Sequence, residues 1–83
     1  MYEIIFSKEA KEQLKKLDQN IQERILQGIE KLRIKPERCL KKLVGDPGFR
    51  LRVGDYRVIV DINRNLVQVL VISVGHRKNI YKK

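Results

Sequence analysis

The feature that most restricts the fold of this chain is a pair of strand-like segments separated by one two-residue turn. Apolar side chains alternate with other residues through Phe49–Val53 and again through Tyr56–Ile62, and Gly54-Asp55 lies between the two segments. Alternation with a period of two predicts half-buried β-strands, and a Gly-Asp pair is typical of a tight hairpin turn. The sequence therefore predicts an antiparallel hairpin whose register is fixed by its turn.

This register places three arginines on one face of the hairpin. Arg52 stands directly opposite Arg57, and side-chain alternation adds Arg50 to the same face. The other face must be the core, because it holds Phe49, Leu51, Val53, Tyr56, Val58 and Val60. Two cations opposite each other destabilise a hairpin by roughly a few tenths of a kcal/mol. The pair therefore favours an anion-binding face, although arginines that merely spread over an open sheet face are the simpler alternative.

Two helices precede the hairpin and one long strand follows it. Residues 2–7 alternate as a short strand, and Ser7 stands where a helix N-cap belongs. The helix that follows runs for about ten residues. Asp18 caps a second helix, which Pro36 terminates. The last strand is expected over Leu66–Val74.

The order of the elements is β-α-α-β-β-β, which predicts the α+β class. The short turns at Gly54-Asp55 and at Asn63-Arg64-Asn65 give an antiparallel meander, and the short joint between the helices gives a helical hairpin. We therefore expect a single domain over residues 1–83, with an antiparallel sheet of about four strands and an N-terminal helical hairpin packed on one face.

The charge composition indicates the kind of partner. The chain of 83 residues has 19 Lys and Arg against 10 Asp and Glu, for a net charge of +9. Residues 49–83 contain eight of these basic residues and only two acidic ones. A basic segment with so few acids usually faces a polyanion, most often nucleic acid.

Other classes of protein are disfavoured by what the chain lacks. One cysteine, Cys39, and one histidine, His76, provide neither a disulfide framework nor a structural zinc site, so we expect no metal and no cofactor. No apolar run is long enough to cross a membrane and no signal peptide is present, so we expect a cytoplasmic protein. Ser7 and Ser73 lack the sequence context of a catalytic serine, and no phosphate-binding glycine loop is found.

Three segments of the chain resemble the RelE toxins of type II toxin–antitoxin modules: Phe49–Ile59 (FRLRVGDYRVI), Val74–Arg77 (VGHR) and Tyr81. The long central block is typical of the wider RelE/ParE superfamily, and Gly-His-Arg followed by a tyrosine favours the RelE branch. The resemblance covers the whole chain. It implies a RelE-like fold and a metal-free endoribonuclease that cuts messenger RNA in the ribosomal A site.

The resemblance also implies a RelB-like antitoxin that wraps around the toxin. We expect its binding segment to be an amphipathic helix or an extended strand with acidic residues opposite Arg50, Arg52 and Arg57. Two alternatives remain: a ParE-like toxin, which has the same fold but inhibits DNA gyrase without cleaving anything, and a nucleic-acid-binding module without toxicity.

The resemblance assigns roles by position. Arg57 matches the family's Tyr-Arg motif, Arg77 the arginine after the last strand, and Tyr81 the C-terminal tyrosine. Arg50 stands where some members have a lysine, whereas Gly48 replaces another active-site lysine of the family. We therefore expect a catalytic set of Arg57, Arg77, Tyr81 and His76, and RNA-phosphate contacts from Arg50, Arg52, Lys78 and Lys42.

Cleavage of RNA without a metal uses the RNA's own 2′-hydroxyl as the nucleophile, and it leaves a 2′,3′-cyclic phosphate and a 5′-hydroxyl. Arg57 and Arg77, both expected to be at least partly exposed, suit the binding of the phosphate because a guanidinium is planar and permanently charged. Two candidates for the general base stay open. Neighbouring arginines would favour the phenolate of Tyr81. Histidine titrates near neutral pH, which suits His76 as a base, although the simpler alternative is that His76 is an exposed loop residue. We rank Tyr81 ahead of His76.

Overall fold

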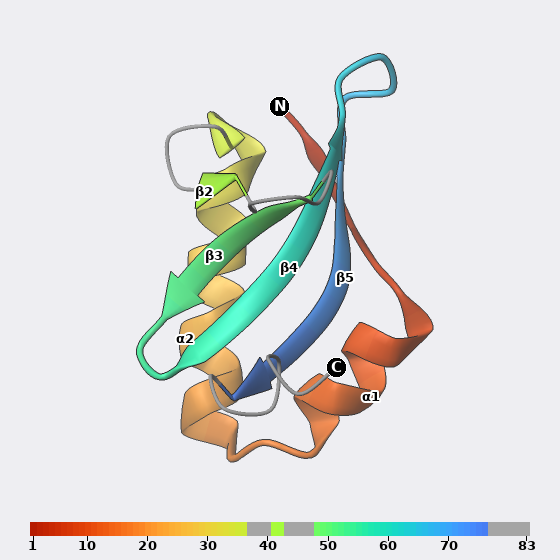
Figure 1. Cartoon of the computed structure of the whole chain (residues 1–83). Helices are drawn as coiled ribbons and strands as arrows, with labels where there is room; N and C mark the ends of the chain where they lie inside the picture. The colour runs from red at the N-terminus through yellow and green to blue at the C-terminus, as the bar shows by residue number, and fades with distance from the viewer. Residues whose placement is uncertain (37–40, 43–47, 77–83) are drawn as a thin grey trace.

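The computed structural model describes residues 1–36, 41–42 and 48–76 (Figure 1). The α+β class and the order of the predicted elements are confirmed, and one two-residue strand is added. The elements are β1 (Glu3–Phe6), α1 (Lys8–Lys15), α2 (Gln19–Glu30), the 3-10 helix η1 (Lys31–Arg33), β2 (Lys41–Lys42), β3 (Phe49–Val53), β4 (Tyr56–Asn63) and β5 (Gln68–His76).

The strands form one sheet in the order β1-β5-β4-β3-β2. The predicted meander is present, because β3 and β4, and then β4 and β5, pair antiparallel. The first strand differs from the expectation of an antiparallel sheet, since β1 runs parallel to β5 with Glu3 beside Gln68 and Phe6 beside Val71. The sheet is therefore mixed. A tight turn joins only antiparallel neighbours, whereas the long helical connection after β1 allows a parallel pair.

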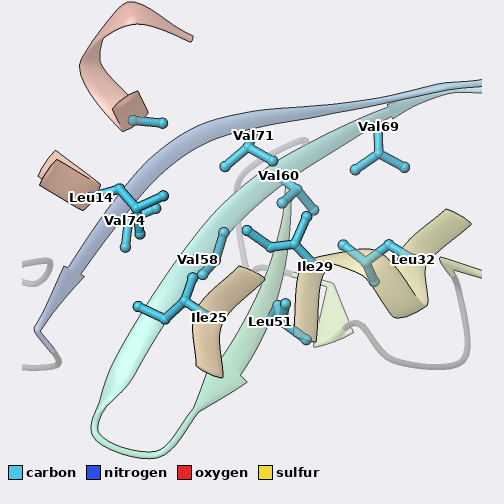
Figure 2. Close-up of a cluster of buried hydrophobic side chains, with 11 residues drawn as sticks. Leu14, Ile25, Ile29, Leu32, Leu51, Val58, Val60, Val69, Val71 and Val74 are labelled. Carbon is cyan, nitrogen blue, oxygen red and sulfur yellow. The ribbon is translucent and has the colours of Figure 1, made fainter. Parts of the chain in front are cut away.

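Both helices cover the same face of the sheet, α1 over β5 and α2 over β3. Figure 2 shows the side chains that fill the space between the two layers. The buried cluster consists of Ala10, Leu14, Ile25, Ile29, Leu32, Leu51, Val58, Val60, Val69, Val71 and Val74. Each fully buried Val, Leu or Ile contributes about 1.5–3 kcal/mol relative to an exposed position. The hairpin face predicted to be the core is thus the face that meets the helices. No helix in the described part of the chain has the length and apolarity to cross a membrane.

A bulge in β5 keeps the strand directed at the core. Ile59 of β4 lies opposite Ser73, whereas the next residue, Val60, lies opposite Val71. Ile72 of β5 is therefore left without an opposite residue. The extra residue moves the alternation of side chains by one position. Val71 and Val74 therefore both point into the core, although an uninterrupted strand would place them on opposite faces.

The beginning of α1 provides hydrogen-bond partners for β5 beyond the end of β1. The Ser7 hydroxyl donates to the Ile72 carbonyl at 2.7 Å and accepts from the backbone N–H of Ala10 at 3.0 Å. Farther along, the Val74 N–H donates to the side-chain oxygen of Gln13 at 2.6 Å. Ser7 therefore caps α1, as predicted, and also joins the helix to the bulge.

The limits of two elements differ from the predictions. Asp18 occupies the N-cap position of α2, but its side chain makes no capping hydrogen bond. Strand β5 begins at Gln68 instead of Leu66 and continues to His76. The side chain of Asn63 accepts a hydrogen bond from the Leu66 N–H at 3.1 Å, which closes a turn that apolarity alone did not reveal.

Replacing the serine cap should destabilise the protein more than replacing the aspartate cap. Ser7→Ala removes the oxygen that joins α1 to the bulge, and we expect it to lower the free energy of unfolding by about 1–2 kcal/mol. Asp18→Ala removes no side-chain hydrogen bond and is expected to cost less than about 0.5 kcal/mol. Urea unfolding of both variants measures the difference, and equal losses would show that the Ser7 contacts do not matter.

Candidate nucleic-acid interface

The hairpin of β3 and β4 has the predicted register. Gly54 adopts a φ of 58°, the left-handed conformation that this tight turn needs and that glycine adopts without strain. Arg52 lies opposite Arg57, and Arg50 lies opposite Ile59. The three arginines therefore share the face of the sheet turned away from both helices, which we call the arginine face.

The three arginines differ in exposure. Arg52 is exposed and Arg50 is half-buried, whereas Arg57 is only 6% exposed and its Nε atom is buried. The expectation that Arg57 is at least partly exposed is wrong. Its strand lies between β3 and β5, so the side chain has neighbouring strands on both sides, with Arg52 opposite on one and Gly75 opposite on the other.

The burial of Arg57 affects how strongly it attracts an anion. A guanidinium does not lose its proton in proteins, so the charge is retained in the sheet. A partly desolvated charge is screened less by water and salt than a surface charge. Among the residues that the structure describes, Arg57 is the only charged residue whose side chain is buried. It is thus held in place beside two more accessible arginines, an arrangement suited to phosphate.

His76 lies on the other side of the sheet from Arg57. It ends β5 opposite Tyr56, and the two rings meet edge to face with centroids 5.4 Å apart and an interplanar angle of 85°. Tyr56 belongs to the face that packs towards the helices. His76 is therefore half-buried in a strand and not an exposed loop residue, and the described structure does not bring it together with Arg57.

The remaining candidate residues are only partly covered by the structure. Lys42 lies in β2, where it pairs with Phe49. Arg77, Lys78 and Tyr81 lie outside the described residues, and their roles stay predictions. Among the described residues, no group of His, Cys, Asp or Glu side chains gathers to hold a metal ion.

The structure adds two cations that sequence reasoning missed. A hollow of about 350 Å³ between α2 and β3 is lined by Arg24, Lys31 and Arg52, with Leu51 and Val53 among its apolar residues. The seven-residue spacing, which is visible in the sequence, places Arg24 and Lys31 on one side of the helix. The sequence does not show which strand this side of the helix meets, because that depends on how the helix packs on the sheet.

Gly28 explains how α2 approaches β3 at this hollow. An added Cβ at Gly28 would lie 3.0 Å from the Val53 side chain and 3.7 Å from that of Leu51. The absence of a side chain therefore allows close approach, and it brings the helix cations to the edge of the arginine face.

Comparisons with known proteins identify the family. The family model described as the ParE toxin of the type II toxin–antitoxin system parDE matches residues 4–81. A search of curated proteins found no match.

Several solved structures have the same fold as this chain and are 28–30% identical to it in sequence. The RelBE2 toxin–antitoxin complex of Mycobacterium tuberculosis aligns with a TM-score of 0.84 and 28% identity over 92% of this chain and 98% of that chain. The intact RelBE complex of E. coli gives a TM-score of 0.78 at 28% identity, covering 92% and 96%. The RelB–RelE complex of Methanococcus jannaschii gives 0.74 at 30%, covering 94% and 95%.

The resemblance to RelE/ParE toxins is thereby confirmed by the family-model match over residues 4–81 and by the similarity to a solved RelE-type toxin–antitoxin structure. The chain belongs to the ParE toxin family of type II toxin–antitoxin systems, within the RelE/ParE superfamily.

Proposed function

We propose that this toxin is a ribosome-dependent endoribonuclease that cleaves messenger RNA in the A site and so inhibits translation. The observation that carries the proposal is the buried guanidinium of Arg57, held opposite Arg52 on the arginine face. Similarity to solved RelE toxins supports this branch of the superfamily. The place of action is then the cytoplasm, and the partner is a RelB-like antitoxin, as in the solved RelB–RelE complexes.

The chemistry follows from the properties of arginine. Attack of the RNA 2′-hydroxyl on the adjacent phosphorus breaks the bond to the 5′ oxygen of the next nucleotide, which takes up a proton from water and leaves as a 5′-hydroxyl. Negative charge builds up on the phosphate oxygens in between. Arg57 donates N–H groups to those oxygens and stabilises the charge, because its position is fixed before the substrate arrives. Arg77 is assigned the second contact to the same phosphate.

Tyr81 is the first candidate for the general base, and His76 is the second. The edge-to-face contact with Tyr56 holds His76 on the helix-facing side of the sheet. A phosphate bound at Arg57 lies on the opposite side. Tyr81 therefore removes the 2′ proton in this proposal, since a nearby positive charge favours a phenolate.

Dependence on the ribosome agrees with the lack of stacking residues on the arginine face among the residues that the structure describes. Single-stranded RNA is usually held by bases stacked on aromatic rings. The aromatic residues in the described part of the chain all pack against the core: Tyr2, Phe6, Phe49 and Tyr56. The arginines, with Lys42 and Lys78, then bind phosphates, and the ribosome holds the bases.

A second candidate function is inhibition of DNA gyrase, as in ParE-like toxins. The description of the matching family model favours it. A protein that only binds gyrase has no need for a buried, preorganised guanidinium, whereas phosphate chemistry does. Measurement of gyrase supercoiling in the presence of the purified toxin distinguishes the two.

Replacing Arg57 should abolish cleavage without unfolding the protein. Arg57→Met keeps a long apolar stem in the sheet and removes the charge, so the protein should stay folded, with a free energy of unfolding lower by about 1 kcal/mol. The rate of cleavage of ribosome-bound messenger should fall by about 10²- to 10³-fold, the usual loss when one preorganised transition-state contact is removed. Arg77→Ala should reduce the rate similarly.

Arg52→Met is the matched control for Arg57→Met. It also removes one charge from the hairpin and relieves the cation pair, but at an exposed position. It should weaken binding more than it slows the cleavage step. Cleavage at the wild-type rate by a folded Arg57→Met, Arg77→Ala double variant would refute the assignment.

Two substitutions separate the candidate bases. Tyr81→Phe keeps the aromatic ring and removes only the hydroxyl, so we expect cleavage to be lost while ribosome binding is retained. His76→Ala should slow cleavage by less than about tenfold, whereas loss of a general base usually slows a reaction by about 10²- to 10⁴-fold. Single-turnover cleavage of saturated complexes measures both, and the reverse ranking would make His76 the base.

Binding to ribosomes should weaken steeply with salt, because Lys and Arg side chains release counterions when they bind phosphates. Arg52→Gln should reduce the slope of log affinity against log salt by about 0.7, the value for one contact to single-stranded nucleic acid. Lys8→Gln removes a charge from α1 and should leave the slope unchanged. A wild-type slope near zero would contradict the phosphate contacts.

A further inference from the structure

Apolar side chains are exposed at the end of β4 that lies away from Arg57. Two backbone hydrogen bonds bring separate segments together there: Tyr2 N–H donates to the Arg33 carbonyl at 2.6 Å, and Glu3 N–H to the Val67 carbonyl at 2.9 Å. Figure 1 shows the amino terminus, the end of the second helical segment and the β4–β5 turn at this end of the molecule. The exposed residues, which we call the tip patch, are Met1 (89% exposed), Ile34 (69%), Leu66 (63%) and Val67 (41%).

The backbone is strained at the same place. Val67 has a φ of 54°, the only positive value outside glycine in the part of the chain that the structure describes. A β-branched residue is a genuine outlier in this left-handed region, whereas Gly or Asn adopts it readily. The side chains of Leu66 and Val67 are exposed, so burial in the core does not explain these residues in this turn. Backbone strain that the fold does not require is often found at binding sites.

The charges around the tip patch indicate what it binds. Exposed Lys35 follows Ile34, and exposed Arg64 precedes Leu66 in the turn. The Glu30 carboxylate, 2.8 Å from Arg33, belongs to an ion pair within the chain, and its hydrogen bond raises the pKa of Arg33. The Glu3 carboxylate, also at this end, accepts a hydrogen bond from the Gln68 side-chain amide at 3.3 Å, so Glu3 and Glu30 both have partners within the chain. The apolar side chains are thus bordered by exposed Lys35 and Arg64, which fits a partner whose apolar anchors are flanked by carboxylates.

A second copy of this chain fits the patch poorly. A two-fold interface would bring Lys35 and Arg64 of one copy close to the same residues of the other, between chains that each carry a net charge of +9. Like charges brought together in this way oppose association. The partner should therefore be a different, acidic protein.

We propose that the tip patch binds the antitoxin of this toxin, through a segment with one or two large apolar side chains flanked by Asp or Glu. The inference rests on the proposed function only in requiring an antitoxin partner, and it holds for either toxin branch. Since the patch and Arg57 lie at opposite ends of β4, this contact is separate from the arginine face. It adds affinity without using the groups that bind phosphate.

The test measures the dissociation constant of the purified antitoxin from wild-type toxin and from the Leu66→Ser, Val67→Asn double variant. The double variant should bind about tenfold more weakly or worse, as expected for the loss of anchor residues at an interface. Ile72→Ser is the matched control, because Ile72 is 43% exposed on the bulge and away from the turn. Its affinity should remain within about twofold of wild type.

Thermal unfolding of the free toxin distinguishes lost contacts from damaged folding. Val67→Asn should raise the unfolding temperature, because asparagine tolerates the left-handed conformation. Weaker antitoxin binding by a more stable toxin supports the proposal.

Three results would overturn the inference: equal affinity of wild type and double variant, a toxin dimer in sedimentation that the double variant loses, or binding to anionic phosphatidylglycerol vesicles that needs Leu66 and Val67. If wild-type toxin binds no antitoxin, the proposed partner itself is wrong. If wild type binds and the double variant binds equally well, only the tip patch inference fails.

Discussion

The charge buried at Arg57 is the constraint on which the proposed site depends. Removal of a guanidinium from water is expensive, and a small domain has a total stability of only about 5–15 kcal/mol. Arg57 nonetheless lies 6% exposed in β4, directly opposite another arginine. Neither burial nor like-charge pairing improves the fold. In the proposed function, both fit a site that is arranged in advance for phosphate.

The rest of the fold keeps this charge in place and leaves one side of the sheet for it. Both helices pack on the opposite face, so the arginine face is not used for the helical core. Ser7 and Gln13 hydrogen-bond the backbone of β5 where β1 has ended, which supports the strand beside Arg57. The exposed apolar residues lie at the other end of β4. One small sheet thus offers two separate surfaces, one basic and one apolar.

Some of this arrangement was predictable from the sequence, and some was not. The Gly54-Asp55 turn fixes a register by itself, so the facing pair of Arg52 and Arg57 was predicted correctly. The burial of Arg57 was not predicted, because the pairing of the strands does not show how much of a side chain its neighbours cover. The side of the sheet that His76 occupies depends on the bulge at Ile72, which reverses the alternation for the end of β5. No residue type at Ile72 signals such a bulge.

Identification of the ends of the cut RNA distinguishes a ribosome-dependent nuclease from a toxin that only binds its target. Purified toxin would be incubated with programmed ribosomes and, separately, with the same messenger free in solution, and the products would be mapped and their termini analysed. We expect cleavage within the A-site codon on ribosomes only, with a 5′-hydroxyl on one product and a 2′,3′-cyclic phosphate or its hydrolysed form on the other. Intact messenger on ribosomes, together with inhibition of gyrase supercoiling by the same preparation, would contradict it.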